Sequence, residues 1–432
     1  MRGVVVLSFL LMYGTTFGQP EPVIRGVSVY AMNNEESFPM IVRDSVANDG
    51  KPVGIKAYIT IQFDVLASDP PPLKIRFHHC NRDWRVDENS LVQDENHNTS
   101  FVLDYRTSPN SIQHYNYRYV NRFPDAADAV RFDYSGNWAF RILDKEERTV
   151  YAEGRFIVAD RIAPTRVRVV NDYLAEGSSP LNQIQRVVVD VRLPDEIDGY
   201  YYTTVDVYQN RKLGNPYRID AHDRDSYTVV EGYNTGSRVF NISNIHPGNE
   251  YRILDLSNVT RYPNRALVRR VEGADQQRQY WRTGQDRNGI ATLNRFAGVN
   301  SDYLEVLFRL DLTDTDHRSV THGGREIFVV GPFNHWMPTL EDRLVYDEME
   351  KSLVARRLLR RGIYDYQYVT GRWDAVTGTV FDQDWLVLEG NDWRTSNTYH
   401  AFVYYNDPRF GGFDRIVGFG TAISSPVLPG SH

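Results

Sequence analysis

The chain of 432 residues contains a single cysteine, Cys80, and this excludes an intrachain disulfide. A chain of this length can bury enough apolar surface to fold without one. His78 and His79 precede Cys80, and such a cluster superficially suggests metal ligands. Consecutive strand residues point to opposite faces of a sheet, however, so the two histidines cannot easily bind one metal ion. We predict a buried thiol at a strand end and no metal site.

Long apolar runs are also absent, since no segment after the N-terminus reaches eighteen consecutive apolar residues. The N-terminus itself has Arg2 followed by a short apolar core over residues 4–12, and small residues at Thr16 and Gly18. This order is typical of a signal peptide, with cleavage expected before Gln19. We therefore expect an exported, soluble mature protein without a transmembrane segment.

The sequence lacks the motifs that mark common catalytic and nucleotide-binding sites. It has no P-loop, dinucleotide fingerprint, nucleophile elbow or HExxH helix. It also lacks a basic run, and its net charge of -7 does not favour a nucleic-acid partner. Carboxylates such as Asp382 and Asp384 are abundant, but a glycosidase pair depends on a separation across a cleft, and we interpret these two as part of a solvated loop. We predict no catalytic residue, no cofactor and no enzymatic activity.

The chain does contain β structure throughout. Aromatic residues make up 13%, with 28 Tyr, a bias that favours strands. Apolar residues alternate with polar ones in two clear segments: Ile59, Ile61, Phe63 and Val65, then Val187, Val189, Val191 and Leu193. This is the period of a strand with one buried and one wet face. The predicted class is all-β, with tandem immunoglobulin-like or early-set antiparallel β-sandwiches.

Turn and linker signals divide the chain into five expected parts. These are a signal peptide (1–18), an N-terminal sandwich (19–162), a middle sandwich (163–300), a C-terminal early-set-like sandwich (301–406) and a tail (407–432). A strand over residues 398–405 is expected to end the C-terminal sandwich. Because the tail is rich in Gly, Pro and Ser, we expect it to be ordered only against a partner.

An aromatic corner follows the predicted strand Glu326–Val330. A Gly331-Pro332 turn leads into Phe333, Asn334 and Trp336. This resembles the Gly-x-Phe-Asn-x-Trp corner of early-set and glycogen-binding β-sandwich modules. Trp336 is then either a sugar-stacking platform or a core ring that closes the end of a sandwich, and the second is favoured because most Trp side chains are largely buried.

A second candidate feature is the stripe Tyr364, Tyr366 and Tyr368, which lines one face of a predicted strand. Aromatic residues are enriched both in strand packing and at binding hot spots. We favour a packed cross-strand ladder with the hydroxyl groups at a wet rim, and a binding surface is the alternative.

Several residue strings together resemble the plug proteins of the type IX secretion system of Bacteroidota, in order over nearly the whole mature chain. The strings are Phe38-Pro39-Met40-Ile41, His78-His79-Cys80-Asn81-x-Asp83-Trp84, Tyr134-Ser135-Gly136-Asn137-Trp138, Gly248-Asn249-Glu250-Tyr251-Arg252 with Asp255, Val330-Gly331-x-Phe333-Asn334-x-Trp336, Gly362-x-Tyr364-x-Tyr366-Gln367-Tyr368, Tyr404-Tyr405, Phe410-Gly411 and Asp414-Arg415.

The resemblance implies a periplasmic protein that closes the giant outer-membrane β-barrel translocon when the pore is not in use. It implies a protein–protein interface that forms reversibly, and no catalytic residues. A rival hypothesis is a periplasmic or surface glycan-binding protein that uses Trp336 and the Tyr364 stripe. A glycosidase is a weaker third option.

Overall fold

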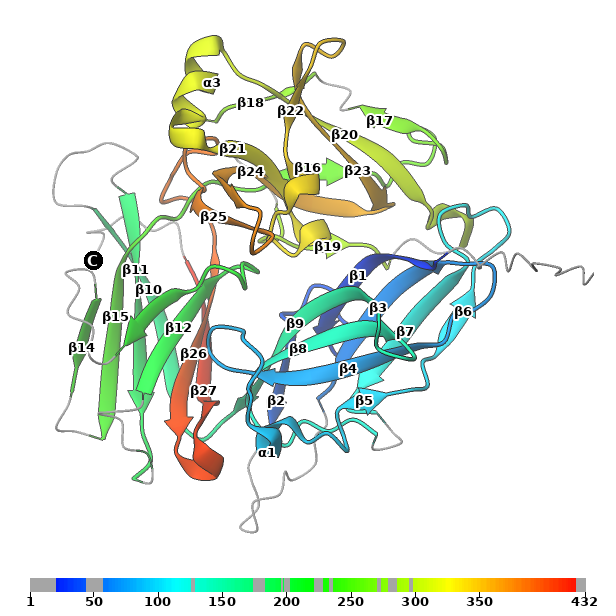
Figure 1. Ribbon diagram of the computed structural model, residues 1–432. Coiled ribbons are helices and arrows are strands. Elements are labelled where there is room, and N and C mark those ends of the chain that lie inside the picture. The colour runs from blue at the N-terminus through cyan, green and yellow to red at the C-terminus, as the bar shows by residue number, and fades with distance from the viewer. Residues whose placement is uncertain are drawn as a thin grey trace, which may run out of the picture.

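A computed structural model describes residues 21–43, 57–125, 129–173, 183–195, 197, 203–220, 228–232, 236–269, 273–278, 286–294 and 298–424. The expected signal peptide lies outside the described residues. β-Sheets form three packed lobes, which we name the N-terminal, middle and C-terminal sandwiches (Figure 1). The prediction of an all-β sandwich fold is confirmed. Within the described part of the chain, no helix has the length and hydropathy that crossing a bilayer would require.

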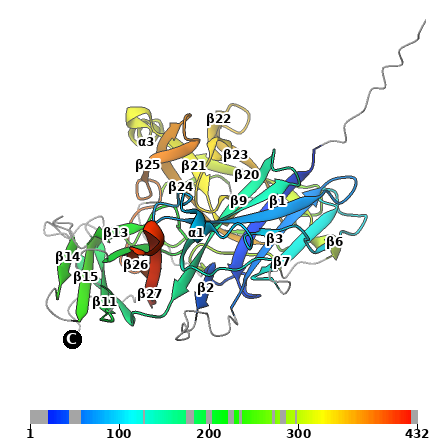
Figure 2. The same cartoon turned by 60° about the horizontal axis from the view of Figure 1, so that its bottom comes forward.

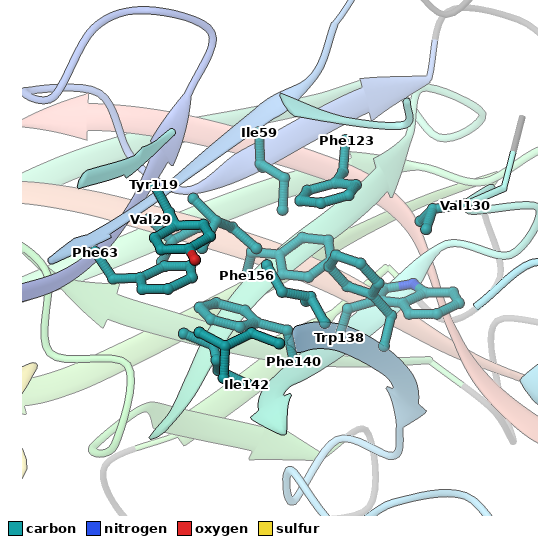
Figure 3. Packing of buried hydrophobic residues seen from close by; sticks show 14 of the residues in the cluster. Val29, Ile59, Phe63, Tyr119, Phe123, Val130, Trp138, Phe140, Ile142 and Phe156 are labelled. Atoms are coloured by element: carbon teal, nitrogen blue, oxygen red, sulfur yellow. The ribbon is translucent and has the colours of Figure 1, made fainter. Parts of the chain in front are cut away.

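The N-terminal sandwich consists of two sheets with the strand orders β1–β3–β7–β6 and β2–β9–β8–β4–β5. Its elements are β1 (Val23–Ala31), β2 (Met40–Arg43), β3 (Ile59–Leu66), β4 (Leu73–Cys80), the short helix α1 (Ser90–Gln93), β5 (Thr99–Ser100), β6 (Tyr105–Thr107), β7 (Tyr117–Phe123), β8 (Gly136–Asp144) and β9 (Val150–Asp160). Ile59, Ile61, Phe63 and Val65 are all fully buried, as their alternation predicts. They belong to one core with rings from the facing sheet, among them Trp138, Phe140 and Phe156 (Figure 3).

The middle sandwich pairs a sheet of order β10–β11–β15–β14 with a sheet of order β13–β12–β26–β27. Its strands are β10 (Thr165–Tyr173), β11 (Gln183–Arg192), β12 (Thr203–Gln209), β13 (Tyr217–Asp220), β14 (Thr228–Glu231), β15 (Ser237–Ile245), β26 (Thr398–Asp407) and β27 (Phe413–Ile423), with the 3-10 turn η6 (Arg409–Gly411). The alternating valines of β11 face this core, as predicted.

The C-terminal sandwich contains the sheets β16–β24–β19, joined by β21 and β25 through β24, and β17–β20–β23–β22, joined by β18 through β20. Its strands are β16 (Arg252–Asp255), β17 (Leu267–Arg269), β18 (Asp275–Gln276), β19 (Ala291–Thr292), β20 (Tyr303–Asp311), β21 (Glu326–Val330), β22 (Val345–Asp347), β23 (Ser352–Arg360), β24 (Ile363–Asp374) and β25 (Thr379–Asp384). Its helical turns are α3 (Asp314–Val320), η2 (Gly298–Asn300), η3 (His322–Gly324), η4 (Pro332–Asn334) and η5 (Leu340–Asp342).

Two strands belong to a different sandwich from the one that their position in the sequence predicts. The strand expected to end the C-terminal sandwich is β26, and it pairs along its length with β12 of the middle sandwich, beside which it lies in Figure 1. Figure 2 shows β26 next to β27 and near β13, two further strands of the same sheet. That prediction is wrong, because apolar alternation shows that a strand has a buried face but does not identify its partner. Conversely, β16 pairs with β24 of the C-terminal sandwich. The expected boundaries at residues 162 and 300 remain predictions.

The expected tail is also corrected over its described part, because residues 413–423 form the long strand β27, paired with β26. Its glycines allow close packing: a Cβ at Gly420 would lie 2.7 Å from Val167 Cγ2, and one at Gly418 would overlap the carbonyl oxygen of Ala163. We interpreted the glycine-rich composition as that of a tail. The glycines instead let β27 approach the start of β10 in the facing sheet.

Candidate functional site

The aromatic corner is a tight turn that locks a Trp ring into the core. Asn334 accepts a hydrogen bond from the Gly331 backbone N–H and donates one to the Val329 carbonyl, both at 3.0 Å. The chain then enters the left-handed region at His335 (φ 52°) and remains there at Trp336 (φ 60°). Trp336 is 2% exposed, and its Nε1–H donates to the Gly289 carbonyl at 3.0 Å. Of the two interpretations, the geometry matches the core ring.

Rings from neighbouring strands complete the corner. Trp336 lies 4.9 Å from the Tyr251 ring, measured between centroids. Phe333 is partly buried and packs against Phe308 at 5.6 Å and Tyr364 at 6.3 Å. Each of these pairs is worth about 1 kcal/mol beyond its buried area. The corner therefore contributes to stability and leaves no flat row of exposed rings.

The Tyr stripe packs in the interior, and its hydroxyl groups are not at a wet rim as we predicted. Tyr364, Tyr366 and Tyr368 are at most 3% exposed. Both Tyr366 and Tyr368 donate to Asp275 Oδ2, at 2.7 and 2.9 Å, while the Tyr364 hydroxyl donates to a backbone carbonyl. Asp275 belongs to a buried ionic network, in which Arg252 lies 3.2 Å from Asp275 and 2.9 Å from the buried Glu389. An ionic network thus satisfies the hydroxyl groups that water would otherwise bind.

The remaining candidate groups also have structural partners. Cys80 is buried at the end of β4, as predicted. His79 contacts Asp87 and the Ser135 carbonyl. Asp382 and Asp384 end the strand β25 and do not form a loop, which corrects our interpretation. No group of three potential metal-binding side chains occurs among the described residues.

Asp382 forms an ion pair with Arg325 at 2.7 Å. Asp384 accepts hydrogen bonds from the backbone N–H groups of Leu386 and Val387. Each carboxylate therefore binds groups in its own neighbourhood, and the two do not face each other across a cleft.

Most of the strings that carry the family resemblance gather at the contact between the N-terminal and middle sandwiches, which we call the first seam. Asn137 donates to the carbonyls of Asn81 and Arg82 at 3.2 Å, and accepts from the Tyr404 hydroxyl at 2.7 Å. The Arg82 backbone N–H donates to Asp414 at 2.8 Å. Residues far apart in the sequence thus meet at one surface.

Buried charges strengthen the first seam. Asp206 on β12 has no exposed surface and bonds Arg82 at 2.9 Å and Arg218 at 3.2 Å. Arg415 on β27 reaches Asp160 of β9 at 2.9 Å. An apolar cluster, including Phe402, Tyr404 and Ile157, packs alongside these pairs. Removing one partner of such a pair costs about 3–5 kcal/mol, because it leaves an uncompensated buried charge.

A second seam joins the N-terminal and C-terminal sandwiches, and it covers the face of β3 that we predicted to be wet. Asp64 is 2% exposed, receives two hydrogen bonds from Arg118 at 2.6 and 2.9 Å, and accepts one from the Tyr303 hydroxyl at 3.0 Å. Asp302 likewise contacts His114 at 2.9 Å. The half-wet prediction is wrong here because the neighbouring sandwich replaces water as the partner of the polar face.

Between these two sandwiches lies a cavity of about 740 Å³. The edges of Phe333, Trp336 and Tyr364 reach its wall. Charged residues on its lining are mainly guanidinium groups: Arg25, Arg141, Arg155, Arg211, Arg356, Arg357 and Arg360, with Glu35, Glu153 and Glu341. Burial lowers the pKa of Arg211 to about 10. Its guanidinium donates to the carbonyls of Glu35 and Ser37. Arg211 follows β12, so these bonds link the middle sandwich to the N-terminal sandwich.

Comparison with known proteins identifies the first lobe. Residues 24–160 match the family model described as "Type 9 secretion system plug protein 1st domain". Residues 24–160 are therefore similar to the first domain of the type 9 secretion system plug proteins. The match ends at the last residue of β9, and the suspected resemblance to this family is confirmed.

Solved structures show that the whole arrangement of lobes occurs elsewhere. A hypothetical protein from Parabacteroides merdae is 20% identical, with a TM-score of 0.72 over 93% of this chain and 97% of that one. This likeness shows a shared fold. A complex of Dpr2 with DIP-Theta is 10% identical, with a TM-score of 0.14 over 52% of this chain and 87% of that one. No curated protein sequence matched the chain.

The sequence analysis did not predict that Asp64, Asp206 and Asp302 hold the seams. The sequence does contain one indication, which is an acidic residue between the β-branched residues of a strand, as in Thr204-Val205-Asp206-Val207. Such a residue faces either water or a buried cation, and a single strand does not distinguish the two.

Proposed function

We propose that the protein is a non-enzymatic periplasmic plug that binds the giant outer-membrane β-barrel of the type IX secretion system and seals or gates its pore. The observation that carries the proposal is the plug-protein match of the N-terminal sandwich. The periplasmic location and the barrel partner are what the resemblance to the plug proteins implies, and the match over residues 24–160 supports them.

The seams support this role in a physical way. A body that closes a wide aqueous pore must resist bending between its lobes. Ion pairs and hydrogen bonds across both seams, from Arg82–Asp206 to Tyr303–Asp64, oppose such bending. Asp206 and Asp64 are almost wholly buried, so bending that pulled a partner away from either carboxylate would leave a buried charge uncompensated.

The glycan-binding alternative loses its proposed residues. A sugar stacks on an exposed aromatic face, whereas Trp336 and the Tyr stripe are almost wholly buried by neighbouring strands. A protein–protein function does not need those rings at the surface.

An exposed apolar segment supplies a contact surface to test first. Phe101 and Val102 are 67% and 84% exposed, and Tyr105 on the edge strand β6 is 45% exposed. We name these three residues the β5–β6 segment. Large apolar residues at an edge favour association with another protein, and aromatic residues are enriched at interfaces.

The test is affinity purification of the tagged protein from native outer membranes, with identification of what is retained. We expect a very large β-barrel protein, and we expect Phe101→Ser with Val102→Ser to reduce its recovery. The matched control is Met349→Ser with Val376→Ser, which removes side chains that are 88% and 94% exposed on the C-terminal sandwich. Absence of any barrel, together with retention on a polysaccharide column, would reject the plug.

A further inference from the structure

A second cavity, of about 550 Å³, lies between the middle and C-terminal sandwiches, away from the β5–β6 segment. Its wall combines aromatic rings with charged and amide groups: Lys212, Tyr217, His246, Gln367, Phe381 and Trp385. The volume is within the range of small-molecule sites. This wall contains polar atoms that no described residue satisfies.

Lys212 is a cation of the same wall that contacts aromatic rings and no anion of the described residues. It is 9% exposed, and its Nζ lies 4.0 Å from the centre of the Trp385 ring and 5.7 Å from that of Tyr251. Neither a hydrogen bond nor an ion pair links its ammonium to any other described residue. Burial lowers its pKa to about 7, and the charge of Glu389 opposes that effect.

The acidic groups nearby are already engaged. Asp382 is paired with Arg325, and Asp384 caps the backbone of the next turn. Glu389 is held by Arg252 at 2.9 Å. A buried ammonium is costly without an anion, and the protein supplies none at contact distance.

Two further polar atoms of the cavity wall, on Gln367 and His246, have no hydrogen-bond partner among the described residues. Gln367 is 3% exposed, and its Oε1 has no hydrogen-bond partner among the described residues. His246 Nδ1 is buried and lacks a partner in the same sense. An oxygen such as Gln367 Oε1 requires an N–H or O–H donor, which a ligand can provide.

We propose that this cavity binds a small carboxylate that also carries a hydrogen-bond donor. The carboxylate pairs with Lys212, the donor satisfies Gln367 Oε1, and the body of the ligand packs against Trp385 and Phe381. The same chemistry occurs in a free hydroxy acid or sugar acid and in the C-terminal residue of a peptide, where an amide N–H lies next to the carboxylate.

The test uses the small number of lysines, six in the full chain. Reductive methylation with ¹³C-formaldehyde gives each lysine one resonance and keeps its charge. In the free protein, the Lys212 resonance should titrate near neutral pH, well below the exposed lysines. Addition of N-acetylglycine or glucuronate should raise its pKa by at least about one unit, because an anion favours the ammonium form. N-acetylglycine methyl ester, without the charge, should leave it unchanged.

Variants separate a site from non-specific binding. Lys212→Met should weaken binding at least about tenfold, as expected when the cation that pairs with the anion is lost. Gln367→Met should weaken it while leaving the Lys212 resonance visible. Lys145→Met, at an exposed position, is the matched control, and thermal melting verifies that each variant is folded.

Either probe alone supports the proposal, and the one that binds identifies the source: N-acetylglycine indicates a peptide terminus, and glucuronate a sugar acid. If neither probe moves the Lys212 resonance, or if Lys212→Met binds as well as the wild-type protein, the cavity is not a carboxylate site. Because this measurement is independent of the barrel, its failure would not affect the plug proposal.

Discussion

At the scale of single residues, charges placed inside apolar strands determine how the lobes meet. Asp206 follows Val205 and precedes Val207, both of which are fully buried in the core of the middle sandwich. Its side chain points the other way, to Arg82 and Arg218. The aromatic corner and the Tyr stripe, which the sequence singles out, serve the core instead. The motifs that stand out in the sequence thus belong to the core. The seams depend on single acidic residues, which no motif marks.

Replacing Asp206 by Ala should therefore destabilise the protein by about 3 kcal/mol, because two guanidinium groups lose their buried anion. Calorimetry should show a lower midpoint, and limited proteolysis should cut faster near the linker between β9 and β10. Glu341→Ala is the control, since Glu341 is 80% exposed in its pair with Arg357 and should have little effect. Equal midpoints for the two variants would contradict a stabilising first seam.

A buried carboxyl beside the aromatic corner gives a pH dependence. Burial, followed by the nearby Asp286, raises the pKa of Glu250 from its ordinary 4.5 to about 8. Between these values the folded protein holds a proton that the unfolded chain has released, so stability falls as pH rises. Above pH 6.5, the ordinary value of histidine, histidines whose pKa burial lowers no longer oppose this trend. The lowered pKa of Lys212 opposes it above about pH 7, and it does so equally in the wild type and in a Glu250 variant.

From pH 6.5 to 8, wild-type stability should fall by about 2 kcal/mol more than that of Glu250→Gln, which carries no titratable group there. Urea unfolding at a series of pH values measures the difference. Glu341→Gln should follow the wild-type curve. Parallel curves for wild type and Glu250→Gln would show that the pKa is not raised.

At the scale of elements, alternation predicted the strands well but not their partners. The buried faces of β3 and β11 were clear from the sequence because each repeats an apolar residue at every second position. The partner of β26 was not clear, because its pairing with β12 joins segments about 200 residues apart and any half-apolar strand fits a sandwich edge. Strand β27 was missed because Gly418 and Gly420 resemble loop composition. Its glycines are explained by close packing, which only the three-dimensional structure shows.

Gly418→Ala should test that explanation, because the added methyl group overlaps the Ala163 carbonyl and Thr165. We expect a loss of about 1–3 kcal/mol, the usual cost of overpacking, seen as a lower calorimetric midpoint. Gly236→Ala is the matched control, since no atom lies within 4 Å of a Cβ there. A Gly418→Ala protein as stable as wild type would mean that β27 does not pack closely on the linker.

At the scale of the whole molecule, the two seams join the N-terminal sandwich to both other sandwiches, and the middle and C-terminal sandwiches also contact each other, where Asn210 donates to the Tyr251 hydroxyl. The N-terminal sandwich contacts both others, through Asp206 and Asp160 on one side and Asp64 and Asp302 on the other. The resemblance strings are concentrated at the first seam and in the packing around β24, so they maintain the shape of the molecule. Shape and rigidity are what a pore seal requires, and neither depends on a catalytic residue.

Ion conductance of the purified translocon in a planar bilayer measures sealing directly. The proposal predicts that adding this protein from the periplasmic side closes open pores, and that washing it out restores the current. The Asp206→Ala variant should close them less completely at the same concentration. A current that is unchanged at saturating protein would contradict the plug function.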